Sequence, residues 1–162
     1  MTRRVYFAFH YQSDIWRVNV VRNSWVTQDR EAAGFYDASL WEEAKKKGEE
    51  AVRQMINEGL KNTSVTAVLI GKDTSKRTWV RYEIQRSHED RKGLLGVYIH
   101  GIEDRNGHTD TQGDNQFGEI GKDASGNSVY FWQIYPTYDW VKDNGYKNFG
   151  DWVQKAAKAA GR

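Results

Sequence analysis

The sequence predicts an α/β domain with a central parallel sheet and helices on both faces. Two apolar runs, at residues 65–70 and 93–100, have the length and composition of strands that are buried on both sides. Residues 78–87, between these runs, carry apolar side chains at helical spacing. Because strand and helix patterns alternate about five times along the chain, we expect parallel strands joined by right-handed crossovers.

Composition narrows the class of protein. The chain has 162 residues, and we expect one domain over residues 1–162. A net charge of +2 does not indicate a protein that binds nucleic acid or a membrane surface. The absence of cysteine excludes disulfides, zinc–thiolate sites and a cysteine nucleophile. No apolar stretch has the length of a signal-peptide core or a membrane span, so we expect a cytoplasmic protein.

The first half of the chain contains signals for two strands and two helices before the run at 65–70. Residues 5–10 predict the first strand, and a helix over residues 15–23 would cover it. Residues 34–37 predict a short second strand that ends in Asp37. Residues 40–60 predict one long helix, because an apolar stripe runs along them beside Glu–Lys pairs four residues apart.

The second half is less regular. Residues 101–127 are rich in Gly, Asp and Asn, and they predict a long loop. An aromatic fifth strand is predicted over residues 128–135, ended by Pro136, the only proline. Residues 148–160 close the chain as a helix with one apolar face.

The candidate site centres on Trp79 and Glu83, which are four residues apart and therefore share a face of the predicted helix. A helical glutamate is more often a solvated charge. This pair, however, follows the carboxyl end of a strand, where open parallel sheets bind ligands. Aromatic rings and carboxylates that follow the other strands should reach the same rim, where they suit the base and ribose hydroxyls of a nucleotide. The rim residues are Phe9, His10, Asp14, Asp37, Trp41, Trp79 and Glu83.

Metal and phosphate-loop signals are missing from the sequence. Neither a Walker-type phosphate loop nor a Gly-x-Gly-x-x-Gly fingerprint is present. The histidines lack metal-ligand spacing, so neither a metal nor a cofactor is expected. They are His10, His88, His100 and His108.

Several segments resemble a known family. Residues 5–11 resemble the opening strand of TIR domains, and residues 34–37 resemble their second strand. Trp79 and Glu83 match the Trp-x-x-x-Glu helix that carries the catalytic glutamate of NAD-cleaving TIR domains. Other segments resemble, more narrowly, the TIR-like proteins of the bacterial Thoeris anti-phage system. These segments are residues 9–11, 17–23 and 37–42.

The resemblance implies a flavodoxin-like TIR fold whose five-stranded parallel sheet has the order 2-1-3-4-5. It implies an enzyme that takes NAD as its substrate and cleaves the nicotinamide–ribose bond. The product would be a cyclic ADP-ribose-type signal that activates a separate effector, with self-association and a phage-derived trigger. Glu83 would be the catalytic residue. The implied substrate-binding residues are Phe9, His10, Asp37, Trp41 and Trp79.

Two other functions stay open at this point. Many TIR domains are adaptors that assemble without chemistry, and an adaptor can keep a helical glutamate for packing. Nucleoside deoxyribosyltransferase-like enzymes use a glutamate in a related α/β fold, although the Thoeris-like segments argue against that class. The linkage of the product is not selected by the residues, but the aromatic side chains Trp25, Trp41 and Trp79 could exclude water. We therefore expect a cyclic product in preference to linear ADP-ribose.

Overall fold

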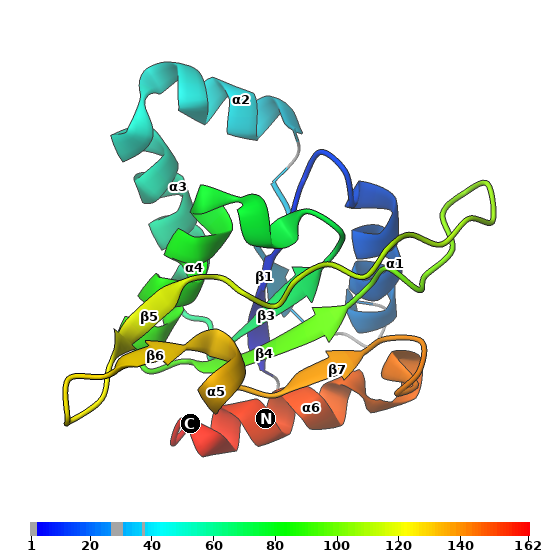
Figure 1. Cartoon of the computed structure of the whole chain (residues 1–162). Coiled ribbons are helices and arrows are strands. Elements are labelled where there is room, and N and C mark those ends of the chain that lie inside the picture. Colours follow the sequence, from blue (N-terminus) through cyan, green and yellow to red (C-terminus); the bar gives the residue numbers. More distant parts are fainter. Residues whose placement is uncertain (1–2, 27–30, 37) are drawn as a thin grey trace.

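A five-stranded parallel sheet forms the centre of the computed structural model, which describes residues 3–26, 31–36 and 38–162. The observed strand order, β2-β1-β3-β4-β7, confirms the predicted topology, in which the chain reverses direction across the sheet after the second strand (Figure 1). The sheet strands are β1 (Arg4–Ala8), β2 (Glu31–Ala33), β3 (Val65–Ile70), β4 (Gly93–Tyr98) and β7 (Thr137–Asp139).

Helices cover both faces of this sheet, as expected for parallel strands. One face packs against α1 (Ile15–Val26) and α6 (Gly145–Ala159), while α4 (Thr78–Glu89) packs on the other (Figure 1). Beside α4 lies α3 (Glu49–Leu60), which is itself packed against α2 (Ala38–Lys47). Helices of the described ranges are all too short or too polar to cross a membrane.

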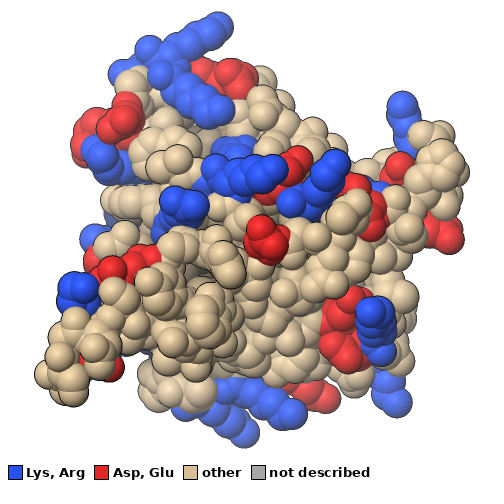
Figure 2. All heavy atoms as spheres, viewed as in Figure 1, with Lys and Arg blue, Asp and Glu red and all other residues tan. Residues whose placement is uncertain are grey.

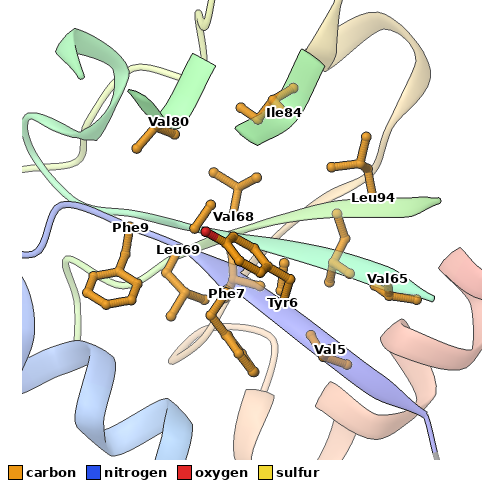
Figure 3. Close-up of a cluster of buried hydrophobic side chains, with 14 of the residues drawn as sticks. Val5, Tyr6, Phe7, Phe9, Val65, Val68, Leu69, Val80, Ile84 and Leu94 are labelled. Carbon is orange, nitrogen blue, oxygen red and sulfur yellow. The ribbon is translucent and has the colours of Figure 1, made fainter. Parts of the chain in front are cut away.

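Alternation along β1 divides the core into two layers. Figure 3 shows the Tyr6 side chain pointing toward Val80 and Ile84 of α4, whereas Phe7 and Phe9 point to the opposite face. On that face the Phe7 ring lies 5.9 Å from the ring of Phe149 in α6. Every residue of β3 is buried, which explains why its sequence is apolar without alternation.

The second strand lies earlier than the sequence predicts. It is formed by Glu31–Ala33, which pairs with β1, and residues 34–36 have left the sheet. Gly34 has a φ of 87°, in the left-handed region where a strand cannot continue. Asp37, the predicted end of this strand, lies outside the described residues.

The long helix predicted over residues 40–60 is two helices. The break falls at Gly48, which has a φ of 115° and caps the start of α3. Only glycine adopts this conformation readily, so the chain turns there although the Glu and Lys residues around it favour a helix.

The fifth sheet strand is also misplaced by the sequence prediction. Residues 128–135 form β6 (Ser128–Tyr130) and the short helix α5 (Phe131–Ile134), and β7 follows Pro136 instead of preceding it. The carbonyl of Pro136 accepts a hydrogen bond from the Gly96 N–H at 2.9 Å. A proline is tolerated here because it stands at the beginning of an edge strand, where its missing N–H faces no partner strand.

The segment at residues 101–127 is anchored by a buried arginine. Arg17 of α1 donates from Nε to the Ile102 carbonyl at 2.7 Å and from Nη2 to the His108 carbonyl at 2.9 Å. Its Nη1 lies 3.8 Å from an Asp110 carboxylate oxygen. Beyond the anchor, β5 (Glu119–Lys122) pairs with β6 as a hairpin, so the expected loop contains local order.

We expect Arg17→Met to loosen this segment without unfolding the sheet. The variant keeps the buried stem but loses two charge-assisted hydrogen bonds, which typically contribute about 1.5–3 kcal/mol each. Arg105 lies exposed inside the anchored segment, so tryptic cleavage after it should become at least about tenfold faster. Arg22→Met on the exposed side of α1 is the control, and equal cleavage of the two variants would contradict the anchoring role.

Candidate nucleotide site

Glu83 is enclosed and does not stand on an open rim. Its side chain is 2% exposed near the middle of α4. Burial raises the pKa of the Glu83 carboxyl to about 8, and the nearby Tyr6 hydroxyl and Arg77 charge only partly oppose that rise. The Tyr6 hydroxyl lies near the carboxyl but has no hydrogen bond of ordinary geometry within the described residues. A carboxyl in this setting is mostly protonated at neutral pH.

Two phenols belong to the same enclosure. Burial raises the pKa of Tyr6, and after burial the Glu83 charge raises it further. The pKa of Tyr36 is raised by the same two causes in the same order. The Tyr36 hydroxyl donates to the Met55 carbonyl at 2.8 Å, and a Cβ on Gly59 would collide with that hydroxyl. Because Gly59 has no side chain, α3 can pack closely against the rings of Tyr6 and Tyr36.

Arg77 links Glu83 to an aromatic pair. The rings of Tyr11 and Trp41 stack in parallel with centroids 5.2 Å apart. The Arg77 guanidinium lies 4.4 Å from the Tyr11 centroid and 5.5 Å from the Trp41 centroid, within range of cation–π attraction. Arg77 Nη1 and Trp41 Nε1 are both buried without a hydrogen-bond acceptor in the described part of the chain.

Tyr11 is held in place by two polar contacts. Its hydroxyl donates to Glu42 Oε1 at 2.6 Å and accepts from Lys45 Nζ at 2.7 Å. Both partners lie on α2, one turn apart, so this helix fixes both members of the aromatic pair. The pair thus forms a fixed, buried aromatic stack beside Arg77.

His10 lies in the same electrostatic neighbourhood as Glu83. Its pKa is lowered by burial and then by the Arg77 charge, and Arg77 also acts on Glu83. The His10 Nδ1 accepts a hydrogen bond from the Ser13 N–H at 3.2 Å. The Arg77 charge therefore acts on both His10 and Glu83, and its guanidinium contacts the Trp41 ring. The partial burial of His10 leaves its other ring nitrogen as a candidate ligand contact.

Other predicted site residues lie elsewhere. The Phe9 ring is 4% exposed and packs 5.7 Å from the Phe35 ring, on the sheet face opposite α4 (Figure 3). Trp79 is half-buried and meets the ring of Tyr82 edge to face, with centroids 5.6 Å apart. The Tyr82 hydroxyl in turn donates to Asn57 of α3 at 2.8 Å, and Trp79 also packs against the hydrophobic core.

Asp14 is a second buried acid, at the carboxyl edge of the sheet. Burial raises the pKa of its carboxyl to about 6, and the Thr74 hydroxyl, 3.4 Å away, opposes that rise. A Cβ on Gly71 would collide with the carboxylate, so glycine is needed directly after β3. The sequence analysis placed Asp14 on the rim, and the structure shows it buried there.

Sequence patterns did not single out four residues of the site around Glu83. They are Arg77, Tyr11, Tyr6 and Tyr36. The available signal was the position of Arg77 immediately before the Trp79 helix, where a cation opposes the helix dipole and is unusual without an acidic partner. Among the described residues, no group of three or more His, Asp or Glu side chains is arranged to hold a metal ion. Figure 2 shows acidic and basic side chains interspersed over the visible face.

The strand order and the helices on both sheet faces are those of a TIR-type α/β fold. A TIR domain of the Toll-related receptor TRR-2 from Hydra magnipapillata superposes with a TM-score of 0.57 over 97% of this chain and 99% of that chain, at 11% identity. That likeness concerns the fold alone.

Sequence comparison narrows the class. The model of the family "Thoeris protein ThsB, TIR-like domain" matches residues 6–104. A Bacillus cereus (strain MSX-D12) protein named "Putative cyclic ADP-D-ribose synthase ThsB1" is 40% identical over 94% of this chain and its own full length. The chain belongs to the Thoeris ThsB TIR-like family.

Proposed function

We propose that this protein cleaves NAD at the nicotinamide–ribose bond and converts it into a cyclic ADP-ribose-type signal. The observation that carries the proposal is the enclosed Glu83 carboxyl, on the helix whose Trp-x-x-x-Glu pattern matches catalytic TIR domains. The name of the Bacillus cereus relative supports the same reaction. Localisation to the cytoplasm, where NAD is available, remains part of the proposal.

Glu83 would act as a carboxylate beside the reacting ribose. As the glycosidic bond breaks, its electron pair leaves with nicotinamide and positive charge develops on the ribose ring. An ionised carboxylate stabilises that charge and can accept hydrogen bonds from the ribose hydroxyls. With a pKa of about 8 the carboxyl is mostly protonated before substrate arrives. The positive nicotinamide ring of NAD would favour ionisation, because an adjacent cation lowers the pKa of an acid.

The remaining groups suit the rest of the substrate. Arg77 Nη1 and Trp41 Nε1 are buried donors without acceptors in the described residues, and phosphate or ribose oxygens of NAD would satisfy them. The Tyr11–Trp41 pair is buried in the closed structure, and one of its rings could stack on a base only after the covering groups move. His10 and Asp37 are proposed to line the entrance, and Trp79 and Phe9 to support it from neighbouring layers.

The enclosure of Glu83 implies that NAD enters only after the covering groups move. A carboxyl that is 2% exposed cannot contact a ribose without displacement of its neighbours. We propose that self-association or a phage-derived trigger favours the open arrangement. The cyclic product would then act on a separate effector protein.

NAD consumption in infected cells tests the enzymatic proposal. Cells that express the protein should lose NAD and accumulate nicotinamide after phage infection, while cells with empty vector should not. A non-enzymatic adaptor would leave both pools unchanged. A deoxyribosyltransferase-like enzyme would instead exchange bases on deoxynucleosides supplied to the purified protein.

Arg77→Gln should shift the pH dependence of cleavage. The Arg77 charge lowers the pKa of Glu83, so its removal should raise that pKa and move the acid limb of kcat/KM to higher pH. The profile of nicotinamide release against pH, measured on activated lysates, reports this shift. Lys76→Gln removes a neighbouring exposed cation and should leave the limb in place, and identical shifts in the two variants would refute a specific role for Arg77.

A further inference from the structure

A cavity of about 510 Å³ lies at the amino edge of the sheet, away from Asp14 and Gly71. It is bounded by the end of α4, the start of β4, the α5–β7 connection and the last turns of α6, which lie next to one another in Figure 1. Its apolar wall includes Leu94, Pro136 and Ala156. This volume falls in the range of small-molecule sites, which are mostly apolar with a few polar groups.

The charged groups of the cavity all have the same sign. Arg91, Lys92 and Lys155 line it, and no acidic residue does. Lys92 is committed to the structure, because its ammonium donates to the Leu60 and Thr63 carbonyls at 2.9 and 2.7 Å. In the described ranges, by contrast, the side chains of Arg91 and Lys155 form neither an ion pair nor a hydrogen bond, and the adjacent acid Asp90 is paired with Arg86.

The backbone at Arg91 gives a separate indication. Its φ of 56° lies in the left-handed region, where glycine or asparagine is usual after a helix. Arginine is less favourable than glycine in this conformation, because its Cβ crowds the neighbouring carbonyl oxygen. Nothing in the described structure uses its guanidinium to offset that cost, which is consistent with a role for the side chain in binding.

We propose that this cavity binds a small amphipathic anion. The apolar body of the ligand would fill the space against Leu94 and Ala156, and its carboxylate, phosphate or sulfonate group would pair with Arg91 and Lys155. The wall also contains His88, hydrogen-bonded to Tyr135, in the last turn of α4. The ligand would therefore contact the helix that carries Glu83, at the opposite end from Arg77.

Binding of naphthalene-2-sulfonate to the purified full chain tests the proposal, with the neutral naphthalene-2-sulfonamide as the matched probe. Calorimetry should give one site, and the sulfonate should bind about tenfold more tightly than the sulfonamide. The double variant Arg91→Gly/Lys155→Gln should remove this preference but keep sulfonamide binding. Lys158→Gln, in the last turn of α6 but outside the residues that line the cavity, should change neither affinity.

Filling the cavity separates this site from adventitious binding. Ala159 lines the cavity and is exposed, so Ala159→Trp can occupy the space without disturbing the core, which an unchanged melting temperature would verify. Both probes should then bind at least about tenfold more weakly. Absence of sulfonate binding to the parent, equal affinity of the two probes, or unchanged binding in Ala159→Trp would each overturn the proposal.

Discussion

Glu83→Gln is expected to lower the rate of NAD cleavage at least about a hundredfold. The variant lacks the negative charge that would stabilise the positive charge on the ribose as nicotinamide leaves. Glutamine has nearly the same size and retains hydrogen-bonding atoms, so the enclosure formed by Tyr6, Tyr36 and Arg77 should persist. The assay is the rate of nicotinamide release in lysates of infected cells that contain equal amounts of each protein.

Glu89→Gln is the matched control for this loss. It makes the same chemical change on the same helix, six residues further on, at an exposed position. Its rate should equal that of the parent. Parental activity in Glu83→Gln, or equal losses in the two variants, would remove Glu83 from the mechanism.

The second large effect concerns stability against pH. The Glu83 carboxyl has a pKa of about 8 in the folded chain and an ordinary value of 4.5 when unfolded. Between these values the folded state binds more protons than the unfolded state, so stability falls as pH rises. At about 1.4 kcal/mol per pKa unit, the loss reaches at most about 5 kcal/mol above pH 8.

Glu83→Gln should remove this loss, because glutamine resembles the protonated acid and does not titrate. Urea unfolding of parent and variant at pH 5 and pH 8 measures the difference. The variant should gain stability relative to the parent by a few kcal/mol between the two pH values. Asp14 and His10 titrate in both proteins, so their contributions to the pH dependence of stability cancel when the variant is compared with the parent. If parent and variant changed in stability equally between pH 5 and pH 8, the pKa of Glu83 would not be raised in the folded chain.

The elements with dense apolar patterns were predictable from sequence. β3 is buried along its whole length, so its composition alone identifies it, and α4 follows from its helical period. The errors occurred where one backbone conformation overrides composition. Gly48 divides α2 from α3 in a stretch of good helix formers, and Gly34 ends β2 before the aromatic residues that suit a strand.

The candidate site was predictable only in part, for a related reason. The sequence places Glu83 on a helix after a strand, but it does not show whether that helix turns the carboxyl toward solvent or toward Tyr6. Strand alternation means that Phe9 and His10 point in different directions, and the structure assigns Phe9 to the far layer. Arg77 was missed because its partners, Tyr11 and Trp41, come from distant parts of the chain.

The mass of the nucleotide product tests the central claim most directly. After nicotinamide leaves, attack by a nucleophile of the same molecule releases a proton and gives a cyclic product, whereas attack by water gives linear ADP-ribose. Mass spectrometry of extracts from infected cells should reveal a product one water lighter than ADP-ribose, present with the parent protein and absent with Glu83→Gln. Accumulation of linear ADP-ribose alone would show a simple NAD hydrolase and contradict the proposed signal synthesis.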